Sequence, residues 1–160
     1  MTSTTQKANY NPKSLMKKIL IGIDPDTDKS GFAMTIDKNI FLINLKFFDL
    51  FQQLYSVKNN PNYKDYQVHI YIECGFLNGG NRHFKAAAST AFNGKISERV
   101  GANHEVAKKI CEMCEFLKLE FTQIQPKRSK LNQFDFKQLT GIKKTTNQEQ
   151  RDAYLLIFGR

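Results

Sequence analysis

The segment from residue 19 to residue 31 constrains the fold more than any other part of the sequence. It reads Ile-Leu-Ile-Gly-Ile-Asp-Pro-Asp-Thr-Asp-Lys-Ser-Gly. Its first five residues, mostly branched and apolar, predict a short buried strand. Pro25 has no amide hydrogen and cannot continue a central strand, so this strand ends at Asp24. Strand character resumes at residues 31–36, which predicts a hairpin with a carboxylate at its mouth.

Two simpler interpretations compete for this acidic turn. Asp residues are frequent in turns because they hydrogen-bond to nearby backbone, and for an isolated turn this interpretation is favoured. Asp24, Asp26 and Asp28 also have the spacing of a calcium loop. An EF-hand loop requires Gly at its sixth position and Glu at its twelfth, where this chain has Lys29 and Thr35. The calcium loop is therefore rejected.

The charge balance indicates the class of partner. Lys and Arg outnumber Asp and Glu by 24 to 15, which gives a net charge of +9 over 160 residues. A basic protein of this size favours a polyanion, and the rival partner, a membrane surface, would require an apolar run or basic amphipathic helix that the sequence lacks. We expect one domain over residues 17–160, after a flexible polar arm at residues 1–16 without a signal peptide.

Three cysteines, Cys74, Cys111 and Cys114, are expected to be reduced thiols. Cys111 and Cys114 have the spacing of a redox or zinc pair, and His104 precedes them by about two and three helical turns. A zinc site needs four ligands, and no second Cys pair exists. Core thiols on an amphipathic helix are the favoured interpretation.

Apolar periodicity predicts the remaining elements. We expect strands at residues 39–45, 67–73 and 120–125 and helices at residues 47–57 and 101–119, with residues 82–99 partly helical. The strand at 67–73 ends on Glu73, so a second strand finishes on a carboxylate. Phe76 follows in a glycine-rich loop, either as an anchor folded onto the core or as a side chain that stacks on a base.

The last helix adds two carboxylates. Thr146 and Glu149 fit a capping box, which is a structural explanation for Glu149. Asp152 shares a helical face with Ala153 and Leu156, so it should point toward the sheet. Burying an unpaired charge is costly, and Asp152 therefore needs a cation, a donor network or a metal ion.

Together these patterns predict a group of four acids at one edge of a sheet, namely Asp24, Glu73, Glu149 and Asp152. Carboxylates placed together repel one another unless divalent cations lie among them. Oxygen-only ligands select hard ions such as Mg²⁺ or Mn²⁺, and two such ions can cleave a phosphodiester. The predicted chemistry is metal-dependent cleavage of a nucleic acid strand.

With these four acids in this order, the sequence resembles a known family, the RuvC-type Holliday junction resolvases of the ribonuclease H-like superfamily. The resemblance spans about residues 18–158. It rests on four short motifs, whose order and separation carry it: Ile21-Gly-Ile-Asp-Pro25, Ile72-Glu73-x-x-Phe76, Pro126-x-x-x-Lys130 and Glu149-x-x-Asp152-Ala153.

The resemblance implies an α/β, ribonuclease H-like fold: a five-stranded mixed sheet flanked by helices, with strands 1–3 antiparallel and strands 4 and 5 parallel to strand 1. It implies that Asp24, Glu73, Glu149 and Asp152 bind two Mg²⁺ ions, for which Mn²⁺ can substitute. Lys130 matches a basic residue beside the scissile phosphate. No small-molecule cofactor is implied.

The implied activity is resolution of four-way DNA junctions by paired nicks, carried out by a homodimer because two opposing strands must be cut. Phe76 matches an aromatic that acts on bases at the crossover. Further DNA contacts are expected from basic residues, namely Arg82, Lys127, Arg128, Lys143 and Lys144. Compact Lys- and Asn-rich members resemble phage proteins, so we expect a cytoplasmic protein, in the host cytoplasm if phage-encoded.

The sequence departs from the family at three places. Asp26 stands where Gly is usual, and Glu149 replaces the commoner Asp. The stretch from Gly141 to Glu149 is short, so a helix of the longer bacterial members should be absent. The second lysine of the site is then either Lys143 or Lys144.

Two other functions remain open from the sequence. The same fold could act on RNA–DNA hybrids, flaps or other branches, because fold alone does not set the substrate. A non-catalytic DNA-binding module is the alternative from another class, although all four acids are present.

Overall fold

The computed structural model describes residues 17–78, 90–127 and 129–160. The expected N-terminal arm, residues 1–16, lies outside the described residues. The strands are β1 (Lys17–Asp24), β2 (Ser30–Ile36), β3 (Asn39–Leu45), β4 (Tyr66–Glu73) and β5 (Glu120–Ile124). The helices are α1 (Phe47–Asn59), α2 (Thr90–Phe116), α3 (Gln133–Thr140) and α4 (Gln148–Leu155), with short 3₁₀ turns η1 (Pro61–Tyr63) and η2 (Gly75–Leu77).

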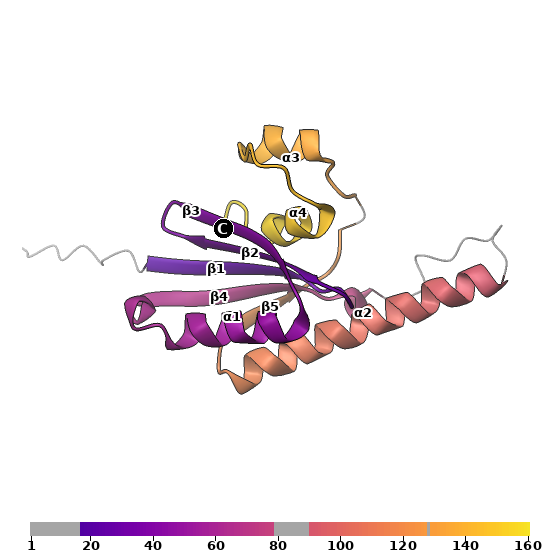
Figure 1. The fold of residues 1–160 in the computed structure, drawn as a ribbon, viewed down its shortest axis with the longest axis horizontal. Coiled ribbons are helices and arrows are strands. Elements are labelled where there is room, and N and C mark those ends of the chain that lie inside the picture. The colour runs from indigo at the N-terminus through magenta and orange to yellow at the C-terminus, as the bar shows by residue number, and fades with distance from the viewer. Residues whose placement is uncertain (1–16, 79–89, 128) are drawn as a thin grey trace, which may run out of the picture.

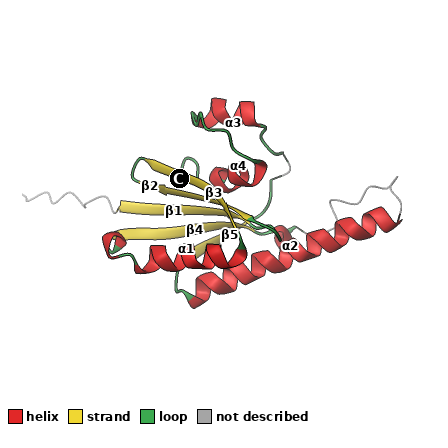
Figure 2. Cartoon of the chain, viewed as in Figure 1, coloured by secondary structure: helices red, strands yellow, loops and turns green. Residues whose placement is uncertain are grey.

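The strands form one mixed sheet in the order β3-β2-β1-β4-β5. β1 pairs antiparallel with β2, and β2 antiparallel with β3. β4 runs parallel to β1, and β5 parallel to β4. The predicted five-stranded sheet, with its antiparallel half and its parallel half, is confirmed, and helices flank it on both sides (Figures 1 and 2).

Two apolar layers hold the helices on the sheet. On one face the buried residues of β1, β2 and β4 pack against α1 and α2, which lie below the sheet in Figure 1. On the other face α4 and Phe136 of α3 pack against Leu20 and Ala33. Alternate side chains of a strand point to opposite faces, so each buried strand serves both layers.

The cysteines belong to the first of these layers. Cys74, Cys111 and Cys114 are buried free thiols, as the sequence predicted. Among the described residues, no group of three or more His, Cys, Asp or Glu side chains is arranged to hold a metal ion. None of the helices described is long and apolar enough to span a membrane.

The structure adds one helix and corrects one cap. The sequence analysis contains no counterpart of α3, which begins after its N-cap Asn132 and ends at Gly141, where φ is +73°. The capping box of Thr146 with Glu149 is wrong, because α4 is capped by Asn147 with Gln150. The Thr146 hydroxyl instead donates to Gln133, a tertiary contact that removes it from the helix cap. Residues 141–147 contain no helix, as expected.

Two glycines allow α4 to lie directly on the strands. A side chain at Gly22 of β1 would overlap the carbonyl oxygen of Ala153, and one at Gly31 of β2 would overlap that of Glu149. The helix backbone therefore touches the sheet backbone without an intervening layer of side chains. This contact places the first turn of α4 over the end of β1, because Gly31 pairs with Asp24.

Gly22→Ala should therefore displace α4 and destabilise the protein by roughly 1–3 kcal/mol, since overpacking forces backbone to move. Chemical denaturation measures the loss of stability. Gly94→Ala is the matched control, because a Cβ there meets no atom within 4 Å. Equal stability of the Gly22→Ala variant and the wild type would contradict the close contact.

Candidate active site

Asp24 and Glu73 end two adjacent parallel strands. Ile23 pairs with Ile72, so the next residue of each strand lies at the same level of the sheet. Ile23 and Ile72 face the layer of α1 and α2, and the alternation of strand side chains turns Asp24 and Glu73 to the opposite face, toward α4. Both carboxylates are half-buried at the edge where the strands end.

Asp152 comes to the same place from the second turn of α4. Its side chain is only 7% exposed, and two donors hold its two oxygens. Lys130 Nζ lies 2.5 Å from Oδ2, and Gln148 Nε2 donates to Oδ1 at 2.7 Å. Asp152 points toward the sheet, as predicted, and of the partners that the sequence left open (a cation, a donor network or a metal ion) it meets a cation and a neutral donor. Sequence reasoning missed Gln148, although its i, i+4 spacing from Asp152 was available.

Glu149 precedes Asp152 by one helical turn. Its backbone lies over Gly31, the residue that pairs with Asp24, and its side chain is half-buried. Its negative charge contributes to the electrostatics of Asp24. Glu149 is thus near the strand end, as predicted for the group of four acids, and the competing explanation, a capping box with Thr146, is wrong.

The charges of these groups influence one another strongly. Burial, followed by the negative charge of Glu73, raises the pKa of Asp24 to about 8, and the charge of Lys130 opposes this rise. Burial also raises the pKa of Glu73. Burial alone would lower the pKa of Lys130, but its contact with Asp152 and the nearby acids outweigh that effect and raise it. The site is a cluster of acids that Lys130 alone only partly neutralises.

The turn after Asp24 is built by its own side chains. Asp26 accepts a hydrogen bond from the Asp28 amide at 2.9 Å, and the Asp26 amide donates to Ser30 Oγ at 3.2 Å. Asn103 of α2 accepts from the Thr27 amide at 3.2 Å. The interpretation of Asp as a turn former thus holds for Asp26, while Asp24 remains turned to the acids.

The donor set fits a hard divalent cation in its chemistry, because it consists of carboxylate oxygens whose mutual repulsion a cation would relieve. The side chains as they stand do not form a finished ligand set. Within the described residues, no three Asp, Glu, His or Cys side chains converge closely enough to bind an ion. The ammonium of Lys130 lies where a cation would approach Asp152.

Phe76 lies in η2, three residues after Glu73. It is half-buried and packs edge-on against His104 of α2, with ring centroids 6.4 Å apart. Phe76 also borders the apolar core. The structure thus agrees with the loop-anchor interpretation, and stacking on a base stays a prediction.

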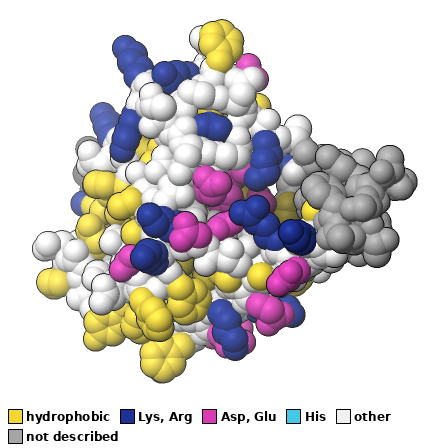
Figure 3. Space-filling view, turned by 45° about the vertical axis from the view of Figure 1, so that its right-hand side comes forward, with side chains coloured by type: hydrophobic (Ala, Val, Ile, Leu, Met, Phe, Trp, Pro, Cys, Tyr) yellow, Lys and Arg dark blue, Asp and Glu magenta, His cyan; other side chains and the backbone are white. Residues whose placement is uncertain are grey.

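The other predicted DNA contacts are basic surface residues. Lys127, Lys143 and Lys144 are exposed, and no ion pair joins them to a carboxylate in the described part of the chain. Arg82 and Arg128 lie outside the described residues. In Figure 3, Lys and Arg side chains (dark blue) occur across the face shown, with acidic side chains (magenta) gathered near its centre.

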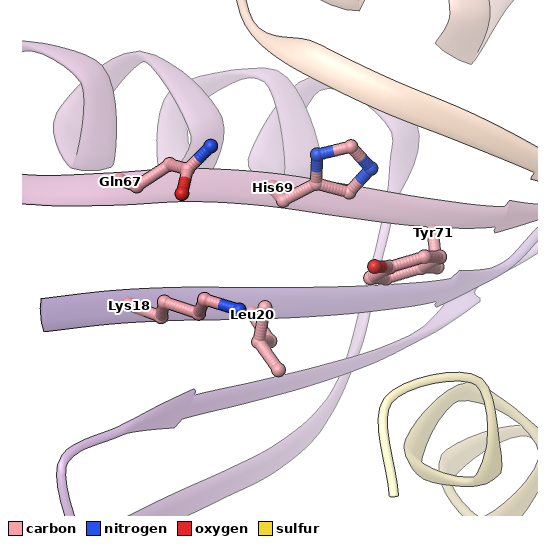
Figure 4. A pocket seen from close by; sticks show the side chains of 5 residues that line it. All are labelled: Lys18, Leu20, Gln67, His69 and Tyr71. Atoms are coloured by element: carbon pink, nitrogen blue, oxygen red, sulfur yellow. The ribbon is translucent and has the colours of Figure 1, made fainter. Parts of the chain in front are cut away.

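A shallow hollow on the same sheet face lies away from the acids. It is lined by alternate residues of the neighbouring strands β1 and β4, namely Lys18, Leu20, Gln67, His69 and Tyr71 (Figure 4). His69 lies on this strand face and hydrogen-bonds to Thr122 on β5 at 2.8 Å. The hollow lies before the strand ends that carry Asp24 and Glu73, and neither acid lines it.

Comparison with known proteins identifies the fold. No protein-family model matches the chain, and no curated protein matches it. Among solved structures, RuvC of Thermus thermophilus in complex with a Holliday junction substrate aligns with a TM-score of 0.50 and 10% identity, over 87% of this chain and 89% of that one. A second Thermus thermophilus RuvC structure gives a TM-score of 0.48 and 11% identity, over 86% and 90%. The chain therefore has the ribonuclease H-like fold that the sequence predicted.

The crowded, half-buried acids predict that the folded protein becomes less stable as pH rises. Folded Asp24 keeps its proton up to about pH 8, whereas its ordinary pKa is 3.8, so the folded state binds more protons between these values. Without divalent cations, stability should fall as pH rises through this window. Asp24→Asn should flatten the fall and stabilise the protein at pH 8 by roughly 1–3 kcal/mol.

Denaturation in EDTA between pH 5 and pH 8.5 measures this effect. Glu120→Gln is the control, because Glu120 is an exposed acid at the opposite end of β5. An Asp24→Asn variant no more stable than the wild type at pH 8 would show that neither burial nor the neighbouring acids disfavour the charged form of Asp24.

Proposed function

We propose that this protein is a Mg²⁺-dependent, structure-selective DNA endonuclease that resolves four-way junctions by paired nicks. The observation that carries the proposal is the group of Asp24, Glu73 and Asp152, which three separate elements bring to one edge of the sheet beside Lys130. The ribonuclease H-like fold and the net charge of +9 support the same chemistry.

The proposed metal ligands are Asp24, Glu73, Asp152 and Glu149. Two bound Mg²⁺ ions would activate water and stabilise the leaving oxygen of a phosphodiester. Asp24 is best placed to serve both ions, because it lies on the strand between Glu73 on one side and Gly31, beneath Glu149, on the other. Its fixed position at the end of a central strand holds the ligand set together.

Lys130 places a positively charged side chain at the proposed site. Its ammonium pairs with Asp152, yet 56% of its side chain is exposed, so it can also face a phosphate that enters from solvent. Lys130 would hold the scissile phosphate and stabilise its developing charge. The exposed Lys127, Lys143 and Lys144, with Arg82 and Arg128, would provide further phosphate contacts.

The proposed substrate is branched DNA, and the proposed active form is a homodimer. A four-way junction has two strands to be cut, and two symmetric sites on a two-fold axis suit that substrate. The Thermus thermophilus protein of the same fold is seen with a Holliday junction, which favours this substrate over a hybrid or a flap. Phe76, in the loop after Glu73, would act on a base at the crossover.

Asp24→Asn tests the catalytic assignment. Because the substitution removes a central ligand while leaving the basic surface intact, cleavage should fall by about 10³-fold or more, and junction binding should change little. Cleavage of a synthetic four-way junction with Mg²⁺, and binding by gel shift with Ca²⁺, measure the two effects. Glu120→Gln should retain both activities.

A substrate panel tests the specificity. Four-way junction, flap, RNA–DNA hybrid and plain duplex should be compared with wild-type protein at equal concentration. Symmetric paired nicks in the junction are expected. Faster cleavage of the hybrid or the flap would contradict the junction as substrate and assign the preferred nucleic acid instead. Binding without any cleavage in Mg²⁺ or Mn²⁺ would favour a non-catalytic DNA-binding module.

A further inference from the structure

Arg151 is a buried guanidinium that neutral groups alone satisfy. It is 9% exposed, and in the described parts of the chain no carboxylate lies within ion-pair distance of it. Burying a cation without an anion is costly, so its donors must be matched by acceptors. They reach four oxygens: Leu131 O at 3.1 Å, Thr146 O at 2.5 Å, Gln133 Oε1 at 3.3 Å and Gln148 Oε1 at 2.8 Å.

The contact with Gln148 fixes which way that amide points. A guanidinium only donates hydrogen bonds, so the side of the Gln148 amide that faces Arg151 must be its oxygen. The amide nitrogen is then turned away, and it donates to Asp152 Oδ1 at 2.7 Å. Arg151 thus determines that Asp152 meets a donor at this oxygen and not a second acceptor.

The contact with Leu131 acts on the other oxygen of Asp152. Leu131 follows Lys130, whose Nζ lies 2.5 Å from Asp152 Oδ2. Holding the Leu131 carbonyl fixes the backbone from which Lys130 extends. Two chains of contacts therefore lead from Arg151 to the Asp152 carboxylate. One passes through Gln148 to Oδ1, and the other passes through the Leu131 backbone and Lys130 to Oδ2.

The remaining contacts join the segments that carry these groups. Gln133 Oε1 accepts from the Thr146 amide at 2.8 Å and from the Thr146 hydroxyl at 2.9 Å, besides Arg151. The beginning of α3 is thereby tied to the loop that leads into α4. A buried network in which each donor finds an acceptor is rigid, and rigidity is what a ligand carboxylate needs.

We infer that Arg151 is a positioning residue for the nuclease site, which orients Asp152 through Gln148 and through the backbone of Lys130. The inference rests on the proposed function, because it assigns Asp152 as a metal ligand. With a donor at each oxygen, Asp152 is held in one orientation, close enough to Asp24 and Glu73 for its charge to raise the pKa of both. Within the described residues, Arg151 itself hydrogen-bonds to neutral oxygens and to none of the four proposed ligand carboxylates.

Mn²⁺ binding to the DNA-free protein tests this role apart from catalysis. Arg151→Lys keeps the charge but loses the fork of donors, and Gln148→Ala removes only the relay. Each should weaken Mn²⁺ affinity, measured by calorimetry, by about 10- to 100-fold. In junction cleavage, the Mg²⁺ concentration for half-maximal rate should rise while KM for DNA stays within about twofold of the wild type.

Asn147→Ala is the matched control, because it removes the cap of the same helix without a contact to Asp152. It should lower thermal stability and leave Mn²⁺ affinity unchanged. The double variant Arg151→Lys, Gln148→Ala should lose less affinity than the product of the single losses, since both act through one amide.

Unchanged Mn²⁺ affinity in folded Arg151→Lys and Gln148→Ala, or a loss in Asn147→Ala as large as theirs, would overturn the inference. Fully multiplicative losses in the double variant would also overturn the relay through Gln148. The two ideas can fail separately. If the wild type binds Mn²⁺ but cuts no junction, and both variants bind Mn²⁺ more weakly than the wild type, the proposed function is refuted while the positioning of Asp152 is upheld.

Discussion

The contact on which the site depends is that of α4 with the sheet, backbone against backbone. Gly22 and Gly31 leave no side chain between them, so Ala153 and Glu149 lie directly on β1 and β2. A helix packed on a sheet normally stands about 10 Å away, because both surfaces carry side chains. Here the closer approach lets the short side chain of Asp152 reach a site otherwise formed by strand ends, and the acids of α4 join those of β1 and β4.

Bringing these acids together destabilises the folded protein, although the proposed function requires it. Burial, together with the repulsion between neighbouring carboxylates, disfavours their charged forms, which raises the pKa of Asp24 to about 8 and also raises that of Glu73. Lys130 offsets part of the repulsion, but it is half in solvent and its attraction is screened. The rest of the fold, two apolar layers on a five-stranded sheet, must hold the acids together in the absence of a cation.

Much of this was predictable because it is local in the sequence. Pro25 ends β1 at Asp24, and alternation places Glu73 at the end of β4, so both strand ends followed from short patterns. The cap of α4 was not predictable, because Thr146 and Asn147 are both good caps. The tertiary bond from the Thr146 hydroxyl to Gln133, 13 residues away, decides between them. Helix α3, eight residues long, has too few apolar positions for periodicity to detect it.

The roles of Lys130 and Arg151 differ for a reason that only the structure reveals. Both are cations next to the same acid in space, yet the ammonium of Lys130 contacts the carboxylate, whereas Arg151 contacts only neutral oxygens. An arginine paired directly with Asp152 would compete with divalent ions for its lone pairs at all times. In the proposed site, Lys130 on its partly exposed arm would leave Asp152 when divalent cations bind and would turn to the phosphate, while the buried guanidinium of Arg151 would keep the carboxylate aligned. The two proposed roles thus follow from burial. The buried guanidinium of Arg151 does not pair with the Asp152 carboxylate, whereas the partly exposed ammonium of Lys130 does.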